Sequence, residues 1–562
     1  MGAKRERIAR SCTNDTTAEK QQQQQQHQHV SRAQWFCPSP FHSIPIRYQE
    51  RMGFFWMLLV GVLSILLIVE ILKWLRNFFT ASQRSRGPDI PSPPAYPILR
   101  HMPYFLDNID DDKKLLAWAE SFKEEGMFVI DTLLGPKRIC IFKEDFIKQV
   151  LVRNCTKYGR SKLLAGVFPQ VKKGILLVNG KEHAWQRKML NPSFSFSSLL
   201  PFVDVFDANA DSLVQYWKEK AKSTLSGVVE ADIHRDFTKL TLDVIGETAF
   251  GYNFNTLTTG ENKVSQSVEL ILAGRSSVMA RLIRRIIPFY DLIPFPENTK
   301  MKKAAEIVNG VVAEVIKNKR EKLRNGGDPN GEISKDLLGK MILLQDKETG
   351  KTLSDEVIEA QVHTFMVAGH ETTSVGLTWI FYLLAKHPAV QEKARGEAKA
   401  VLGSSTSVRS EDLDKLSYIT AVINESLRMY PPFAVFMREA LQDDVIGGYK
   451  IQKGSYILIP ICVLHHMEEN WPNHNDFRPE RFLDAGEKQS EIGNYTFMPF
   501  SNGPRNCIGW KFAVMEMKVV VAKLLTTFKF ELDPRQKAIS TKLRLSLKPF
   551  PKPILRISAI EG

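Results

Sequence analysis

One cysteine stands in a glycine-bracketed loop just before a helical pattern, and this placement suits a buried thiolate ligand. Residues 500–509 read Phe-Ser-Asn-Gly-Pro-Arg-Asn-Cys-Ile-Gly, and apolar residues follow at helical spacing at positions 512, 515, 519 and 522. We therefore expect Cys507 immediately before a helix N-terminus, where amide donors and the helix dipole stabilise a thiolate. Gly503 and Gly509 would let the backbone pass close to a flat partner. The alternative for a single cysteine is a structural role in a turn.

A second stretch that could do chemistry lies inside a long predicted helix, which begins at Ser354-Asp-Glu and ends near His387-Pro388. Residues 368–373 read Ala-Gly-His-Glu-Thr-Thr, and a glycine in mid-helix costs about 1 kcal/mol relative to alanine. That cost makes sense if the backbone gives up space to a ligand. A polar face on an exposed helix is the alternative, but the flanking residues indicate burial: Phe365, Met366, Val367, Leu377, Trp379 and Ile380.

The cysteine loop and the helix segment together resemble the cytochrome P-450 family. The spacing Phe-x-x-Gly-x-Arg-x-Cys-x-Gly is similar to that family's haem-binding loop, so the resemblance makes Cys507 the proximal iron ligand of haem b. It also implies haem-binding roles for Phe500, Gly503, Arg505 and Gly509. The resemblance extends from about residue 88 to the C-terminus and implies the family's helix-rich, triangular fold.

In this resemblance, residues 368–373 are the oxygen-handling part of the family's I helix. Ala368 and Gly369 would lie at the groove for dioxygen, and Glu371 and Thr372 would guide protons to it. The long-chain fatty-acid hydroxylase branch of the family often carries a glutamate, esterified to the haem, at the position of Ala368. A covalent haem ester is therefore not expected here, and an assignment to fatty acids loses one support.

Arginines are expected at the haem propionates. Residues 180–194 resemble the family's C-helix segment, in which a tryptophan and an arginine four positions later hold a propionate. Arg187 matches the arginine, whereas His183 stands in the tryptophan's place and could donate instead of it. Arg438 and Arg505 match two further arginines near the propionates. A solvated helix face is the alternative for Arg187, but a buried propionate needs a cation.

An acid and two arginines resemble the family's structural triad behind the haem. Glu425 and Arg428 are three residues apart, on one face of a helix that ends before Pro431-Pro432, and Arg481 follows in Phe-Arg-Pro-Glu-Arg-Phe. On its own, Glu-x-x-Arg is a common surface pair worth a few tenths of a kcal/mol. In the resemblance, the three side chains hold the core on the haem side.

These motifs need one large domain to position them. The resemblance implies the cytochrome P-450 fold, mainly α with small β-sheets, preceded by a single N-terminal transmembrane helix. We expect a disordered, glutamine-rich extension at 1–51, an anchor at 52–75, a basic and proline-rich hinge at 76–98, and the catalytic domain at 99–562. Residues 127–141 alternate and predict a strand pair that turns at Gly135-Pro136. Six scattered cysteines indicate neither a disulfide framework nor a zinc cluster.

The anchor prediction depends on an uncharged run at residues 53–69, which is long enough to span a bilayer. Lys73, Arg76, Arg84 and Arg86 follow this run and favour a cytosolic catalytic domain. We therefore expect a single-pass protein of the endoplasmic reticulum membrane, with a cleaved signal peptide as the alternative. Met52 directly precedes the run, so the extension is either translated or lies upstream of the working start codon.

The resemblance implies a monooxygenase that inserts one oxygen atom from O2 into a hydrophobic small molecule: a lipid, sterol, terpenoid or xenobiotic. Because the chain shows no nucleotide or flavin motif, electrons from NADPH are expected through NADPH-cytochrome P-450 reductase, with cytochrome b5 as a second candidate partner. The net charge of +14 permits an acidic partner or a membrane lipid surface, but no nucleic-acid motif accompanies it. Two alternatives stay open: a haem-thiolate isomerase or dehydratase acting on peroxides, and a haem-binding protein without catalysis.

Overall fold

The computed structural model divides the chain into two compact units, Met1–Arg86 and Gly87–Gly562. It describes residues 61, 64, 89–97, 99–132, 137–161, 169–258, 263–276, 290, 293–326, 331, 333–405, 407–483 and 495–560. The predicted extension lies outside the described residues, as do nearly all of the predicted anchor and the hinge before residue 89. Within the described residues, no helix combines the length and the apolar composition that a membrane span requires.

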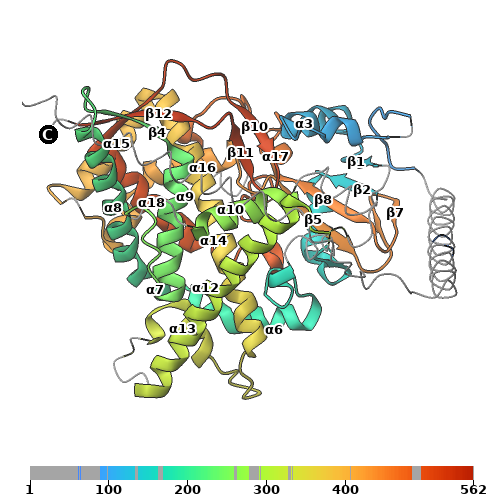
Figure 1. Cartoon of the computed structure of the whole chain (residues 1–562). Coiled ribbons are helices and arrows are strands. Elements are labelled where there is room, and N and C mark those ends of the chain that lie inside the picture. The colour runs from blue at the N-terminus through green and yellow to red at the C-terminus, as the bar shows by residue number, and fades with distance from the viewer. Residues whose placement is uncertain are drawn as a thin grey trace, which may run out of the picture. The chain divides into compact units, whose positions relative to one another are not determined.

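The second unit is mainly helical, and α14 (Asp355–Lys386) runs through its centre (Figure 1). Ser354 takes the N-cap position, two acidic residues occupy the first turn, and Pro388 begins the next helix. The predicted bounds of this helix are therefore confirmed. Nearly every side chain from residue 360 to residue 385 is buried, as expected for a helix that is packed on all sides.

The other helices pack around α14 or against the sheets, and α9 makes the most extensive contact with α14. They are α3 (Asp111–Ser121), α4 (Glu144–Lys148), α6 (Gly180–Leu190), α7 (Phe196–Leu199), α8 (Val203–Lys222), α9 (Ile233–Ile245), α10 (Lys263–Ser276), α12 (Pro296–Gly326), α13 (Leu337–Leu343), α15 (Pro388–Leu402), α16 (Ser417–Met429), α17 (Ile461–Leu464) and α18 (Trp510–Thr527).

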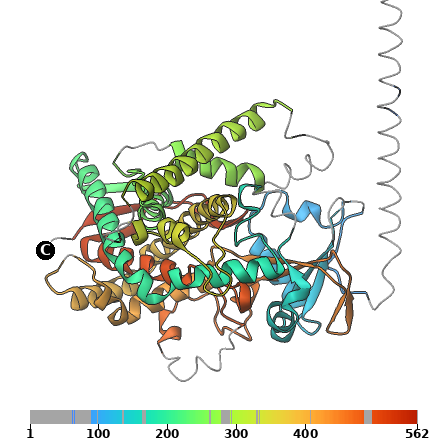
Figure 2. The same cartoon turned by 90° about the horizontal axis from the view of Figure 1, so that it is seen from below.

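The five-stranded sheet lies to one side of the larger helices, whereas the sheet that contains β4 and β12 lies beside α8 and α15 (Figure 1), and Figure 2 gives a second view of the same arrangement. The five-stranded sheet has the order β1-β2-β8-β5-β3, in which only β2 and β8 are parallel. Its first two strands pair Met127 with Ile141, which confirms the predicted strand pair, although the expected turn residues 135 and 136 lie outside the described residues. The strands of this sheet are β1 (Met127–Ile130), β2 (Arg138–Ile141), β3 (Tyr158–Gly159), β5 (Val435–Ala440) and β8 (Tyr456–Pro460).

The remaining strands form smaller antiparallel sheets. A three-stranded sheet has the order β4-β12-β9, and β10 pairs with β11 in a hairpin close to the C-terminus. The strands are β4 (Val228–Asp232), β6 (Asp444–Ile446), β7 (Tyr449–Ile451), β9 (Phe528–Leu532), β10 (Ser540–Leu543), β11 (Leu547–Phe550) and β12 (Ile554–Ala559). We call the pair β10–β11, with its turn at residues 544–546, the C-terminal hairpin.

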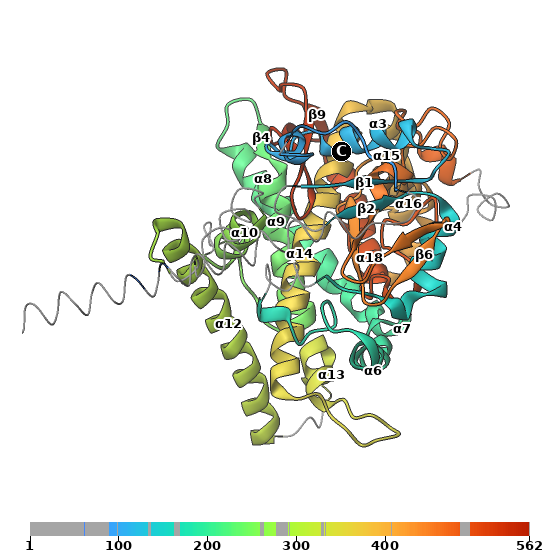
Figure 3. The same cartoon turned by 90° about the vertical axis from the view of Figure 1, so that its right-hand side faces the viewer.

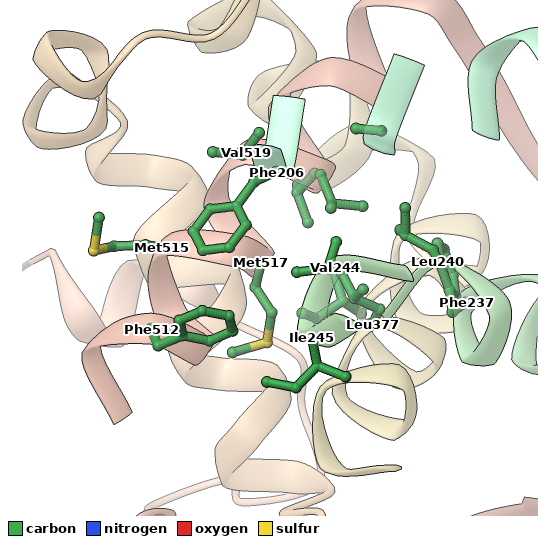
Figure 4. Packing of buried hydrophobic residues seen from close by; sticks show 14 of the residues in the cluster. Phe206, Phe237, Leu240, Val244, Ile245, Leu377, Phe512, Met515, Met517 and Val519 are labelled. Atoms are coloured by element: carbon green, nitrogen blue, oxygen red, sulfur yellow. The ribbon is translucent and has the colours of Figure 1, made fainter. Parts of the chain in front are cut away.

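Two hydrophobic cores hold the second unit together. The helical core lies among α8, α9, α14, α16 and α18, and Figure 4 shows Phe206, Phe512 and Met517 grouped within it. The sheet core lies between the five-stranded sheet and helices such as α3, which covers β1 and β2 (Figure 3). Burial of these apolar side chains is the main favourable term in folding.

Two close approaches bring the elements of the site onto α14. A Cβ at Gly376 would lie 3.3 Å from the sulfur of Met517, so this glycine lets α14 and α18 pack closely. On another face, the Trp379 ring nitrogen donates to the carbonyl oxygen of Leu547 at 2.8 Å. The cysteine loop before α18 and the C-terminal hairpin are therefore both fixed relative to the middle of α14.

Candidate active site

The loop at residues 500–509 is closed by its own backbone. The Cys507 amide donates to the carbonyl oxygen of Phe500 at 2.9 Å, and the Asn506 amide donates to that of Gly503 at 3.0 Å. A short helical turn, η13 (Gly503–Arg505), lies between them, and Gly509 is the N-cap of α18. The predicted position of Cys507, directly before a helix, is confirmed.

The two glycines of this loop differ in whether neighbouring protein atoms exclude a side chain. Gly503 has φ +72°, and a Cβ there would lie 2.4 Å from the carbonyl oxygen of Leu151 in η2 (Gln149–Arg153). The chain's own backbone therefore needs glycine at 503, and the expected approach of a flat partner stays a prediction. Gly509 has φ −93°, and the nearest atom to its added Cβ is in Phe194, at 3.9 Å. Packing among the described residues therefore leaves room for a methyl group at 509.

The Cys507 side chain is not covered by neighbouring side chains, although it lies deep among protein atoms. This surrounding raises the pKa of the thiol, and the Gly509 amide, Arg187 and Arg160 act in the opposite direction. The expected interactions that stabilise a thiolate are thus present, but they do not outweigh the cost of removing its charge from water. A metal ion bound to the sulfur would favour the thiolate form, because coordination deprotonates a thiol.

Arginines gather on the sheet side of this loop. His183 of α6 is buried, and burial lowers its pKa to about 4, helped by four nearby guanidinium groups: Arg505, Arg187, Arg160 and Arg438. Burial also lowers the pKa of Arg438 well below its usual value, and the charges of Arg160 and Arg505 lower it further. The structure therefore brings together the predicted Arg187, Arg438 and Arg505, with His183 among them.

Arg160 was not predicted as a site residue. It directly follows β3, which pairs with β5 so that Gly159 lies opposite Glu439, and this register places Arg160 beside Arg438. Burial lowers the pKa of Arg160 to about 10, and the charge of Cys507 partly opposes the shift. No motif surrounds Arg160 in the sequence, so only the pairing of β3 with β5 identifies it.

Several N–H groups of the arginine cluster have no hydrogen-bond partner among the described residues. Arg160 Nε, Arg438 Nη2 and Arg505 Nη1 are buried and have no hydrogen-bond partner among the described residues. Within the same residues, the charges acting on these three groups come from one another and from cysteines, and from no carboxylate. Buried cations of this kind need an anion, and a ligand that carries two carboxylates beside the Cys507 sulfur would supply it. The residues present therefore fit haem.

Arg187 and Trp185 have other partners. Arg187 donates to the carbonyl oxygen of Asn506 at 2.7 Å and to its side-chain oxygen at 2.8 Å, so it fastens α6 to the cysteine loop. The Trp185 ring nitrogen donates to Asp346 at 3.0 Å, away from the arginines. His183, which stands in the place of the family's tryptophan, thus lies in the arginine cluster, whereas Trp185 pairs with Asp346.

The middle of α14 has one face that is not closely packed. Between residues 360 and 385, the side chains that are not fully buried are those of Val367, Ala368, Gly369 and Thr372. Thr372 Oγ1 donates to the Ala368 carbonyl oxygen at 2.7 Å, one turn earlier. A Cβ at Gly369 would lie 2.6 Å from Ile245 of α9. Packing against α9 therefore restricts a side chain at this position, and the expected role of Gly369 in giving space to a ligand stays a prediction.

Glu371 faces a different partner from Thr372. Its carboxylate accepts a hydrogen bond from Ser546 Oγ at 2.7 Å and pairs with Lys548 Nζ at 2.9 Å, both from the C-terminal hairpin. Burial alone would raise the pKa of Glu371, but Lys548, His370 and these hydrogen bonds outweigh it and hold the pKa below its usual value. The sequence identified Glu371 but gave no sign of Ser546 or Lys548.

Glu425, Arg428 and Arg481 are in contact, as predicted. Arg428 donates to both carboxylate oxygens of Glu425 at 2.7 and 2.9 Å, and Arg481 Nε donates to one of them at 3.2 Å. The remaining arginine donors reach backbone carbonyl oxygens, among them that of His465 at 2.8 Å. Glu425 and Arg428 are fully buried, so this network ties α16 to the segment before η11 (Pro479–Phe482).

Comparison with known proteins agrees with this geometry. A family model described as Cytochrome P450 matches residues 91–555. An ultra-long-chain fatty acid omega-hydroxylase of Homo sapiens is 31% identical to the chain, with 86% of this chain and 90% of the relative covered. Cytochrome P450 4A6 of Oryctolagus cuniculus is 32% identical, with 87% and 93% covered, and cytochrome P450 4A10 of Rattus norvegicus is 34% identical, with 73% and 79% covered.

Proposed function

The chain belongs to the cytochrome P450 family of monooxygenases, and from this premise we propose that it uses haem bound at Cys507 to insert one oxygen atom from O2 into a hydrophobic small molecule. One observation carries the proposal: an uncovered cysteine sulfur lies beside arginines with buried N–H groups that have no hydrogen-bond partner among the described residues. When bound, a haem with a thiolate ligand supplies oxygen activation, because the thiolate pushes electron density that favours cleavage of the O–O bond.

The protein side chains would bind and orient this group. The Cys507 sulfur would be the iron ligand, supported by the Gly509 amide. Arg160, Arg438 and Arg505 would hold the two propionates with the N–H groups that have no partner among the described residues, and the neutral His183 would add one donor. Each of these contacts satisfies a buried donor, which is otherwise costly.

Thr372 and Glu371 are proposed to handle protons on the other side of the site. Thr372 lies on the loosely packed face of α14 with Ala368, and its hydroxyl can exchange its bond to the Ala368 carbonyl oxygen for one to a bound molecule. Glu371 lies next to it in the chain and carries its charge into the interior. A proton held at the Thr372 hydroxyl could thus be renewed through Glu371.

A lipid-like substrate is proposed, and fatty acids are the first class to test. The human relative is named an ultra-long-chain fatty acid omega-hydroxylase and covers 86% of this chain. Ala368 provides no carboxylate for an ester to haem, so the haem is expected to be extractable by acidified solvent. Sterols, terpenoids and xenobiotics are the other classes in the panel.

Electrons are proposed to enter from NADPH-cytochrome P-450 reductase on the face that carries the cysteine loop, with cytochrome b5 as a second partner. A surface hollow of about 580 Å³ lies there, between α6 and the loop, and is lined by residues such as Lys188 and Pro504. Trp510 is exposed next to it, at the start of α18. We further propose that residues 52–75 anchor the protein in the endoplasmic reticulum membrane.

The test is a pair of measurements on the full-length protein in detergent. The reduced protein with carbon monoxide should show the absorption band of a thiolate-ligated haem, and Cys507→Ser should abolish it; a retained band would overturn the assignment of Cys507. With reductase and NADPH, the wild-type protein should hydroxylate at least one member of the substrate panel. Conversion of organic peroxides without NADPH, and no hydroxylation with it, would instead identify an isomerase or dehydratase.

A further inference from the structure

We propose that Lys548, with Ser546, is a positioning residue for proton delivery: the C-terminal hairpin holds the Glu371 carboxylate in place through an ion pair and a hydrogen bond. The inference rests on the proposed function, because it assigns to Lys548 an effect on a proton that Glu371 and Thr372 handle. Lys548 acts through Glu371 and is not itself proposed to touch substrate or haem.

The contacts converge on one atom. Ser546 Oγ donates to Glu371 Oε1 at 2.7 Å, and Lys548 Nζ lies 2.9 Å from the same oxygen. Ser546 ends the turn of the hairpin and Lys548 is the second residue of β11, so both point to α14 from one strand end. Two donors on one oxygen fix the direction of the carboxylate more firmly than a single ion pair could.

The hairpin itself is fastened at the residue between these two. The Leu547 carbonyl oxygen accepts from the Trp379 ring nitrogen at 2.8 Å, and the Leu547 amide donates to the carbonyl oxygen of Pro432 at 2.9 Å. Trp379 lies on α14, two turns after Glu371. The position of Lys548 relative to Glu371 is therefore set by backbone contacts, and not only by the flexible lysine side chain.

The other charged and titratable groups near Glu371 do not replace Lys548. His370 and His234 are buried beside the pair, and burial lowers the pKa of each and so disfavours its charged form. His234 Nδ1 lies 3.2 Å from Thr378 Oγ1, and its surroundings also include Asp232 and Lys552, which pair with each other at 3.2 Å. Glu269 of α10, which is exposed, acts on His370. Lys548 is thus the cation in direct contact with Glu371.

The ion pair also links the interior to solvent. The Glu371 side chain is 5% exposed, whereas the Lys548 side chain is 26% exposed. Removing the ammonium group would leave a buried carboxyl without its counter-charge, and dehydration would then favour its neutral form. A neutral Glu371 would no longer be the anion that accepts a proton, so NADPH would be consumed without equivalent product.

The sign of the pH effect follows. In the wild-type protein the Glu371 pKa lies below its usual value, so Glu371 is ionised throughout the range from about pH 6 to about pH 8.5 and does not change the coupling there. In Lys548→Met the pKa rises, so the coupling, measured as product formed per NADPH consumed, should fall as the pH is lowered. We expect a loss of about threefold or more at the acid end and recovery at the alkaline end, since a buried carboxyl shifts by one or more pH units.

Three variants separate positioning from a general structural role. Lys548→Arg keeps the charge and should restore the wild-type profile. Lys542→Met is the matched control, because Lys542 lies directly opposite Lys548 in the hairpin and its ammonium group stacks on Phe550 at 4.5 Å. Ser546→Ala removes one hydrogen-bond donor only and should shift the pH profile of coupling in the same direction as Lys548→Met, but by less. This variant also tests the proposal if Lys548→Met does not fold.

Infrared difference spectroscopy gives a readout that needs no turnover. At neutral pH, the difference spectrum between Lys548→Met and Lys548→Met/Glu371→Gln should show the carbonyl band of a protonated Glu371. The difference spectrum between the wild-type protein and Glu371→Gln should instead show the bands of an ionised Glu371 carboxylate. Loss of turnover in the wild-type protein would count against the proposed function but would leave this test intact. An unchanged coupling profile and a carboxylate signal in Lys548→Met, or an equal effect of Lys542→Met, would overturn the proposal.

Discussion

Replacing Glu425 by glutamine should cost more stability than any exposed charge substitution, because it leaves two arginines without their anion. Glu425 accepts from Arg428 Nε at 2.7 Å and Nη2 at 2.9 Å, from the Arg478 amide at 3.0 Å and from Arg481 Nε at 3.2 Å. Glu425 and Arg428 are both 0% exposed. Whichever way a glutamine amide turns, its NH2 group would face N–H donors instead of accepting from them.

The magnitude follows from this burial. Removing one partner of a buried, hydrogen-bonded ion pair costs about 3–5 kcal/mol, because the remaining charge stays dehydrated. A typical domain has a free energy of unfolding of about 5–15 kcal/mol, so Glu425→Gln should lose a large share of it. The carbonyl contacts of Arg428 with His465 and His474 remain, and they limit the loss to this range.

The assay is urea unfolding of the full-length protein in detergent, followed by tryptophan fluorescence. Trp471 is a suitable reporter, because the Arg428 guanidinium lies 5.4 Å from its ring centre. Glu321→Gln is the matched control: Glu321 pairs with Lys317 at 3.7 Å, both side chains are more than half exposed, and the expected loss is below about 0.5 kcal/mol. If Glu425→Gln lost no more free energy of unfolding than Glu321→Gln, the reasoning would be wrong.

Three further substitutions, at Gly503, Gly509 and Arg160, test the site by itself. In urea unfolding of the haem-free protein, Gly503→Ala should destabilise the fold by about 1–3 kcal/mol, since it combines a left-handed φ with a clash against the Leu151 carbonyl oxygen. Gly509→Ala should leave the unfolding of the haem-free protein unchanged but weaken haem binding, and equal unfolding effects of the two variants would refute the contrast. Arg160→Met should weaken haem retention by about tenfold, measured as haem transfer to apomyoglobin, because one charged hydrogen bond is lost. The control is Arg153→Met, because Arg153 is exposed, and it should not change haem retention. If both variants retained haem equally well, Arg160 would not belong to the site.

Local patterns in the sequence predicted the central elements well. The loop before Cys507, the bounds of α14 and the contact between Glu425 and Arg428 all follow from residues within one or two turns of each other, where spacing and capping rules apply. The structure shows each of them in the expected place. The haem-binding and proton-handling roles of these residues stay predictions.

Contacts between distant segments could not be predicted in this way. Arg160 joins the site through the pairing of β3 with β5, and Lys548 reaches Glu371 from a hairpin near the C-terminus. At Gly369 an added side chain would meet Ile245 of α9, a neighbour that a single helix does not reveal. Periodicity reports which face of an element is buried and not which element covers it.

The arginine cluster lies between the two hydrophobic cores, and this position has a consequence for the life of the protein in the cell. Arg438 belongs to the five-stranded sheet and Arg160 directly follows its strand β3, whereas His183 and Arg187 belong to α6 on the helical side. A haem bound at this boundary would replace the repulsion among the arginines by attraction to its two carboxylates and would join both halves, and ligand binding of this kind adds to stability. The lifetime of newly made chains in the cell should therefore increase with the concentration of available haem. Haem synthesis would then limit how much of the protein is protected from proteolysis.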